Sequence, residues 1–179
     1  MGNAQDDMGK AQDDMGRIGL ITLEQLLESR DRRAAHQKEL LAAFPDCALI
    51  CLTVQLPGAV KRSPTSLLIG GTGLAALLDK FGSVLRHAQV RDLETGYEAY
   101  LLVPLPPVLV KKACCAIEDT HPLGRLMDID VVGVDREALG LAPRRCLLCD
   151  QPARVCMRAR SHTPEELLLR IEQMVAAYV

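Results

Sequence analysis

The order of secondary-structure signals between residues 47 and 134 constrains the fold of this chain more than any other feature. An apolar run stopped by Pro57-Gly58 is typical of a buried strand, and Glu94-Thr95-Gly96 between two strand-like runs is typical of a hairpin turn. The elements expected in order are a strand at 47–56, a helix at 66–81, hairpin strands at 84–91 and 97–103, a helix at 106–119 and a strand at 126–134.

Strand, helix, hairpin, helix, strand is the split β-α-β order of ferredoxin-like folds, so we expect the α+β class. The sheet would be mixed or antiparallel, with the two helices on one face. The alternative is the mixed sheet of nucleotidyltransferases, in which a strand also carries a pair of carboxylates. Helices should flank this unit, because Thr22 with Gln25 and Thr163 with Glu166 form capping boxes.

The first sixteen residues differ from the rest of the chain, because they repeat AQDDMG and contain few apolar side chains. Such a segment cannot bury enough surface to offset the entropy of ordering. We therefore expect a disordered tail at 1–16 and a single domain at 17–179. A chain of 179 residues that is 49% hydrophobic is suited to one compact core.

Composition excludes several classes of partner. Trp is absent and aromatic residues make up 3% of the chain, which argues against a stacking platform for single-stranded nucleic acid. The net charge of -2 gives no general attraction to polyanions. We expect no apolar stretch to reach the length needed to cross a bilayer. Seven cysteines with an adjacent pair, Cys114 and Cys115, suit reduced thiols. We expect a cytoplasmic protein without nucleic-acid or membrane partners.

Two carboxylates stand on the last predicted strand, in Gly124-Arg125-Leu126-Met127-Asp128-Ile129-Asp130-Val131. Strand side chains alternate between faces, so Asp128 and Asp130 share one face while the apolar residues around them pack behind. Such a pair can hold a hard divalent cation against a phosphate-bearing substrate. An Asp-x-Asp pair can also occur by chance or cap the end of a strand.

The segment PRRCLLCDQPARVCMRARSH, which follows this strand, is rich in arginine and cysteine. Several guanidinium groups that converge on a pocket can bind a triphosphate, although a solvated basic face is the simpler reading. The candidate phosphate-binding residues are Arg125, Arg144, Arg145, Arg158 and Arg160. Four soft or imidazole groups could bind Zn²⁺ or could be inert buried thiols beside a histidine. These four are Cys146, Cys149, Cys156 and His162.

A glycine-rich stretch, IGGTGLAA at residues 69–76, nearly matches a dinucleotide-binding fingerprint and has Asp92 further on. That reading requires a strand before the stretch and a parallel strand after it. The hairpin predicted to follow does not supply a parallel strand. We therefore favour a flexible helix start and keep a dinucleotide-binding protein as an alternative.

The motifs HPLGRLMDIDVVG and LGLAPRRCLLCDQPARVCMRARSHTPEEL resemble those of the holo-citrate lyase synthase family, the apo-citrate lyase phosphoribosyl-dephospho-CoA transferases. The segments LEQLLESRDRR, LPGAVKRSP and ETGYEAYLL fit the same family in order and spacing. The resemblance covers residues 20–179. The chain departs from the family pattern at Met157 and Ala159, where Ala and Ser are expected.

The resemblance implies transfer of 2'-(5''-triphosphoribosyl)-3'-dephospho-CoA to a serine of the acyl carrier (gamma) subunit of citrate lyase, with release of diphosphate. This is a nucleotidyltransferase-type displacement, which depends on positioning and charge neutralisation. We expect Asp128 and Asp130 to hold Mg²⁺ and His121 to act as the base, with Glu118 and His162 as alternatives. A zinc-binding interaction module is the alternative from another functional class.

Overall fold

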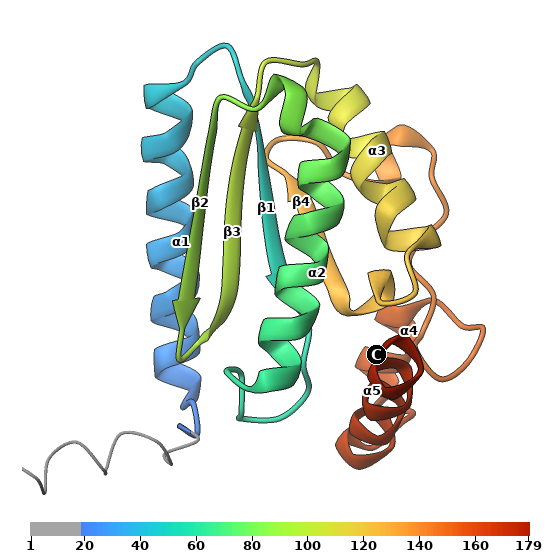
Figure 1. The fold of residues 1–179 in the computed structure, drawn as a ribbon. Helices are drawn as coiled ribbons and strands as arrows, with labels where there is room; N and C mark the ends of the chain where they lie inside the picture. The colour runs from blue at the N-terminus through green and yellow to red at the C-terminus, as the bar shows by residue number, and fades with distance from the viewer. Residues whose placement is uncertain (1–18) are drawn as a thin grey trace, which may run out of the picture.

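The computed structural model describes residues 19–179, which form a four-stranded antiparallel sheet with helices on both faces (Figure 1). The tail predicted at residues 1–16 lies outside the described residues. The strands are β1 (Ala48–Val54), β2 (His87–Leu93), β3 (Gly96–Val103) and β4 (Met127–Val131). The helices are α1 (Leu23–Ala43), α2 (Pro64–Phe81), α3 (Pro107–Thr120), α4 (Ala153–Ala159) and α5 (Pro164–Tyr178).

The strands lie in the order β2-β3-β1-β4, and every neighbouring pair is antiparallel. Leu52 at the centre of β1 pairs with Ala99 on β3 and with Ile129 on β4. The α+β class and the antiparallel sheet are confirmed. The alternative of a mixed sheet is wrong, because no parallel pair occurs among the strands of residues 19–179.

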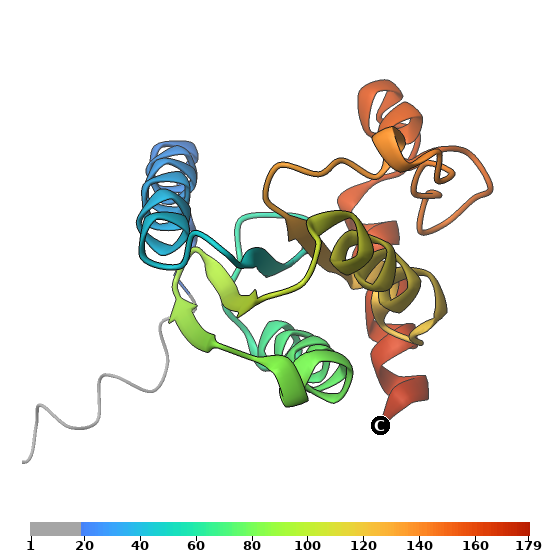
Figure 2. The same cartoon turned by 90° about the horizontal axis from the view of Figure 1, so that it is seen from above.

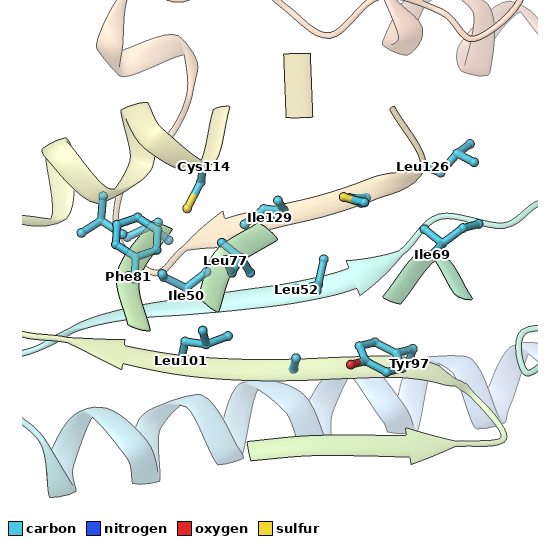
Figure 3. Packing of buried hydrophobic residues seen from close by; sticks show 14 of the residues in the cluster. Ile50, Leu52, Ile69, Leu77, Phe81, Tyr97, Leu101, Cys114, Leu126 and Ile129 are labelled. Carbon is cyan, nitrogen blue, oxygen red and sulfur yellow. The ribbon is translucent and has the colours of Figure 1, made fainter. Parts of the chain in front are cut away.

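The first face of the sheet carries the main core, under α2 and α3 (Figure 2). Figure 3 shows Ile50, Leu52 and Ile129 on the strands packed against Leu77 of α2 and Cys114 of α3, all of which are fully buried or nearly so. Removing this apolar surface from water contributes roughly 25 cal/mol per Å². The expectation that both connecting helices lie on one face is confirmed.

The second face is covered by α1, whose side chains reach β2 and β3. Leu40 packs with Tyr100 in a smaller core, and Arg33 Nε donates to Glu98 Oε1 at 2.9 Å. His36 lies edge-on to the Tyr100 ring, with 4.9 Å between the ring centroids. On the same face the β4 residue Asp130 is left exposed, so α1 does not close this side of the sheet.

Element boundaries follow the predicted pattern with local shifts. The capping boxes at Thr22 and Thr163 are confirmed. β2 begins at His87 rather than at residue 84, because Gly82–Val84 form a short 3-10 turn after α2. β4 ends at Val131, because the chain turns at Gly133 with φ +84°. The seven-residue helix α4 has no counterpart in the sequence prediction.

Within residues 19–179, one segment, Pro64–Val84, is long and apolar enough by length and composition to cross a membrane. This corrects the expectation that no such stretch exists. The inner side of α2, which forms most of this segment, packs on the sheet, with Ile69, Leu77 and Phe81 buried in the main core. A core helix passes the same test of length and composition.

Candidate functional site

The two carboxylates of β4 lie on the α1 side of the sheet. The alternating residues Met127, Ile129 and Val131 point to the opposite face of the sheet, where they are buried in the main core, as the strand alternation predicts. The side chain of Asp128 is 31% exposed and that of Asp130 is 67% exposed. The pair therefore combines a half-buried carboxylate with one that is open to solvent.

Asp128 is held by two donors from outside β4. Its Oδ1 accepts from Arg144 Nη1 at 3.1 Å, and its Oδ2 accepts from Gln55 Nε2 at 2.9 Å. Burial raises the pKa of Asp128, and the neighbouring charge of Asp130 raises it further, against the lowering effects of Arg144 and Gln55. The charge of Asp130 is therefore close enough to disfavour ionisation of Asp128.

Two buried side chains of α3 complete the hydrogen bonding of β4, which is an edge strand. Lys111 Nζ donates to Ile129 O at 2.9 Å and to Asp130 Oδ1 at 3.1 Å, and Glu118 Oε1 accepts from Ile129 N at 2.8 Å. Lys111 and Glu118 are seven residues apart, or about two helical turns, so they share one face of α3. An edge strand offers unpaired backbone groups, and these two side chains satisfy both of those at Ile129.

Charge and burial compete at both of these α3 residues. Burial lowers the pKa of Lys111, but the charge and hydrogen bond of Asp130 outweigh it, so the pKa is raised. Burial raises the pKa of Glu118, despite the opposing effects of Arg144 and of the Ile129 N–H. The sequence does not single out Lys111 as a site residue, since a lysine on a helix is solvated by default. The sequence signal that could have identified Lys111 is its spacing of seven residues from Glu118, which places both on one face of the helix.

Arg144 joins the segment that follows β4 to the carboxylate site. Besides Asp128, its guanidinium donates to Met127 O at 2.6 Å and to Arg125 O at 3.1 Å, and it lies 3.6 Å from Glu118 Oε1. Because its donors are already engaged by the protein, Arg144 fixes the start of β4 and orients Asp128. The structure thus brings together Asp128, Asp130 and Arg144 of the predicted residues.

Arg136 is a second arginine at this site, and the sequence prediction missed it. Its guanidinium contacts Glu118 at 3.4 Å and also binds Asp119 and the backbone oxygen of Ala142. No motif distinguishes Arg136, since its carboxylate partners are 17 and 18 residues away in the chain. Its position could only be learned from the folded chain.

The other predicted phosphate-binding arginines lie outside this hydrogen-bonded group. Arg125 is half-buried, and burial, together with the charge of Arg144, lowers its pKa. Arg145 is 71% exposed and lies 3.8 Å from Asp150, while Arg158 and Arg160 are exposed at the end of α4. None of these four side chains has a recorded contact with the β4 carboxylates among residues 19–179.

His121 lies apart from the carboxylates, at the end of α3. Its Nδ1 accepts from Leu123 N at 3.1 Å, its ring lies 5.6 Å from that of Tyr178, and burial lowers its pKa. It lines an open groove of about 600 Å³ with α2 residues that include Thr72 and Asp79. The structure therefore does not bring His121 to the Asp128 side of the sheet.

The glycine-rich stretch at residues 69–76 lies inside α2 and is not a loop at its start. A dinucleotide fingerprint needs its glycines in the strand-to-helix turn, where backbone N–H groups face the pyrophosphate. Gly70 and Gly73 instead allow α2 to pack closely, because added Cβ atoms would meet Tyr97 at 2.4 Å and Leu52 at 3.1 Å. The dinucleotide-binding alternative is not supported by this geometry.

Gly124 precedes the carboxylate strand and has a steric role. A Cβ atom at this position would lie 2.6 Å from the backbone oxygens of both Ile117 and Glu118. We expect Gly124→Ala to lower the free energy of unfolding by about 1–3 kcal/mol, because backbone atoms must move apart. Urea denaturation measures this change.

Gly71→Ala is the matched control for Gly124→Ala. Nothing lies within 4 Å of a Cβ atom built at Gly71, and the residue is in the interior of α2. This substitution should stabilise the protein by about 0.5–1 kcal/mol, because alanine loses less backbone entropy in a helix. Equal stability of the two variants would contradict the steric argument.

Four predicted ligand residues gather in the segment after β4. Cys146, Cys149, Cys156 and His162 place their ligand atoms within 4.8 Å of one another. Cys149 Sγ lies 3.5 Å from Cys156 Sγ and 3.4 Å from His162 Nε2. The structure therefore forms a Cys3His group that could hold a metal ion, separate from the carboxylate pair.

Residues 21–178 match the family model described as apo-citrate lyase phosphoribosyl-dephospho-CoA transferase, or CitX. This span includes both β4 and the Cys3His group. The chain belongs to this family. The resemblance found in the sequence motifs is thereby confirmed, and the chain is a transferase of the CitX family.

Curated relatives agree with the family match. A probable apo-citrate lyase phosphoribosyl-dephospho-CoA transferase of Vibrio cholerae serotype O1 (strain M66-2) is 39% identical over 167 residues, which are 88% of this chain and 93% of the relative. A protein of the same description from Streptococcus pyogenes serotype M3 is 34% identical over 88% of this chain and 87% of its own length. This CitX-family chain thus matches its relatives along nearly their whole length.

Proposed function

We propose that this chain transfers the 2'-(5''-triphosphoribosyl)-3'-dephospho-CoA group to a serine of the apo acyl carrier (gamma) subunit of citrate lyase. The observation that carries the proposal is the family match over residues 21–178, which spans the whole carboxylate site. The partners are then the acyl carrier subunit and the triphosphoribosyl precursor, without a nucleic acid or a membrane. The Cys3His group supports a different role, which is argued separately below.

The proposed reaction is a displacement at phosphorus. The serine oxygen forms a bond to the phosphorus nearest the ribose, the bond from that phosphorus to the diphosphate oxygen breaks, and the serine proton passes to a base. Diphosphate leaves with the electron pair of the broken bond. Catalysis of such a transfer rests on positioning and on neutralisation of phosphate charge.

We propose Mg²⁺ as the cofactor, held by Asp128 and Asp130. Asp130 Oδ2 accepts no hydrogen bond from any of residues 19–179, and each Asp128 oxygen accepts a single one, so carboxylate lone pairs remain. The ion-paired group at the site has more carboxylates than cations. The carboxylates are those of Asp119, Asp128, Asp130 and Glu118, and the cations are Lys111, Arg136 and Arg144.

A negatively charged triphosphate would be repelled by this carboxylate-rich site. A divalent cation would offset that repulsion and shield the charge on the reacting phosphate, which is the chemistry that Mg²⁺ supplies when bound. The donor set fits a hard cation, since carboxylate oxygens are its preferred ligands. Arg144 orients Asp128 toward this position.

Substrate phosphates require cations that the protein has not already engaged. We propose Arg125, Arg145, Arg158 and Arg160 for this role, because these guanidinium groups are only half-buried or are exposed. The groove position of His121 favours another base for the serine proton.

The finer classification of the protein is also proposed. The chain is a nucleotidyltransferase-type enzyme by its reaction, with a ferredoxin-like sheet. The sheet order supports this arrangement, since β3 lies between β1 and β2 and β1 lies between β3 and β4. A cytoplasmic location is supported by seven cysteines that are all free thiols.

Mass spectrometry of the carrier subunit tests the proposed transfer. Apo carrier incubated with this protein, Mg²⁺ and the triphosphoribosyl precursor should gain the mass of the phosphoribosyl-dephospho-CoA group and release one diphosphate per carrier. A carrier in which the target serine is replaced by alanine should gain no mass. Absence of modification with folded protein and a competent carrier would refute the function, and full activity without any divalent cation would refute the Mg²⁺ site.

A further inference from the structure

The segment between β4 and α5 has almost no hydrophobic core of its own. Of residues 132–163, all of which the structure describes, only Cys146 and Cys156 are buried, with 8% and 7% of their surfaces exposed. Two thiols cannot bury enough apolar surface to offset the entropy of ordering so long a segment. A cross-link or a bound metal is the usual substitute for a core in such a structure.

The distances within the Cys3His group suit a tetrahedral metal. With Zn–S near 2.3 Å and Zn–N near 2.0–2.1 Å, the edges of the tetrahedron are about 3.8 Å between two sulfurs and about 3.5 Å between sulfur and nitrogen. The observed separations from Cys149 Sγ are 3.5 Å to Cys156 Sγ and 3.4 Å to His162 Nε2. A disulfide would bring the sulfurs to about 2.05 Å, so this separation does not describe a covalent pair.

The backbone around the first two cysteines forms a tight knuckle. Cys146 N donates to Gln151 O at 2.7 Å, and Ala153 N donates to Arg144 O at 2.8 Å, so the loop closes on itself. The closed loop therefore holds the sulfurs of Cys146 and Cys149 within 4.8 Å of each other.

We propose that Cys146, Cys149, Cys156 and His162 bind one structural Zn²⁺, which holds Arg144 in the carboxylate site. Three thiols release their protons to solvent on binding, and the imidazole binds through its neutral nitrogen. Four protein ligands complete the tetrahedron, so no coordination position remains for a substrate. The soft thiolate set favours Zn²⁺ over the hard Mg²⁺ proposed at the carboxylates.

Arg144 connects the zinc site to the rest of the protein. It stands two residues before Cys146, its backbone oxygen closes the knuckle, and its side chain reaches Asp128 and Met127 O. The ion therefore holds the backbone of Arg144 in place, and the side chain of Arg144 orients Asp128. Zinc binding itself is independent of the proposed function, whereas its consequence for transfer rests on that function.

Metal analysis of the full-length protein tests the site. Protein purified under reducing conditions and dialysed against zinc-free buffer should retain one zinc per chain by inductively coupled plasma mass spectrometry. Cys149→Ser and His162→Ala, at two half-buried ligands, should each lose the metal, while Cys47→Ser, at a half-buried cysteine outside the group, should keep it. The proposal would be overturned if the wild-type protein contained no zinc or if both variants retained it. A Cys149–Cys156 disulfide in protein purified under reducing conditions would overturn it as well.

Hydrogen exchange tests the link to Arg144 without any substrate. Removal of zinc by a chelator should speed amide exchange at least about tenfold across residues 144–162, including Cys146 and Ala153, because metal binding and local folding are coupled. Amides of β1 and β3 should keep their protection, since their core does not involve the metal. Unchanged exchange in the 144–162 segment after complete removal would overturn the positioning role. These outcomes do not depend on transfer activity, so they separate failure of the zinc site from failure of the proposed function.

Discussion

Asp128→Asn is expected to lower kcat/KM for transfer of the prosthetic group by about 100- to 1,000-fold, because several kcal/mol of charge stabilisation at the reacting phosphate are lost. Asparagine is close in size to aspartate, so it keeps the volume of the site while removing the negative charge that the proposed Mg²⁺ would require. It also removes the charged partner of Arg144, which donates to Asp128 Oδ1 at 3.1 Å. The measurement is the initial rate of carrier modification at several precursor concentrations.

Asp46→Asn is the matched control for Asp128→Asn. Asp46 is exposed in the turn before β1 and has no recorded ion pair or hydrogen bond through its side chain with any of residues 19–179. The control should keep activity within about twofold of the wild type and stability within about 0.5 kcal/mol. Comparable activity of Asp128→Asn and Asp46→Asn, with both proteins folded, would show that the carboxylate strand is not the reaction site.

Glu118→Ala is expected to lower the free energy of unfolding by about 3–5 kcal/mol. Glu118 is 3% exposed, accepts the Ile129 N–H at 2.8 Å and pairs with Arg136 at 3.4 Å. Alanine would leave the Ile129 N–H of β4 without an acceptor in a buried position and would remove one of the two carboxylate partners of Arg136. Urea denaturation followed by circular dichroism measures the loss, and binding of the carrier is not needed.

Glu172→Ala provides the control for this loss of stability. Glu172 is exposed on α5, and its side chain makes no recorded ion pair within residues 19–179. Its replacement should change stability by at most about 0.5 kcal/mol. A loss below about 1 kcal/mol for Glu118→Ala would mean that β4 does not depend on this side chain.

The pH dependence of stability gives a second measure of Glu118. Burial raises its native pKa above the ordinary glutamate value, so the native state binds this proton more tightly than the unfolded chain. The resulting stability is present below the ordinary value and is lost as the pH rises through the native pKa. Relative to the wild type, Glu118→Gln should therefore become more stable as the pH rises from about 4 to 7. A stability difference that is independent of pH would contradict the raised pKa.

Local patterns in the sequence predicted much of the fold. The capping boxes at Thr22 and Thr163, the hairpin turn before Gly96 and the helix-opening Pro107 all appear where the sequence places them. Each of these signals depends on residues a few positions apart, which interact in almost any tertiary context. The exception is α4, which is too short to show a periodic apolar pattern.

The candidate site was only partly accessible from the sequence. The alternation around Asp128 correctly placed both carboxylates on one face, and the spacing of the cysteines anticipated the Cys3His group. The proximity of His121 to this strand along the chain was misleading. The turn after α3 places its ring against Tyr178, on the side of α2. Distance along the chain does not decide which face of a sheet a residue reaches.

The sequence by itself determined the family, the order of the elements and the shared face of Asp128 and Asp130. Only the tertiary structure decided that Lys111 and Glu118 satisfy the edge of β4 and that Arg144 orients Asp128. Strand alternation and helix capping follow from backbone geometry over a few residues, so the sequence encodes them directly. The contacts of Lys111, Glu118 and Arg144 with β4 join residues 11 to 19 positions apart, and they exist only because the folded chain holds those residues together.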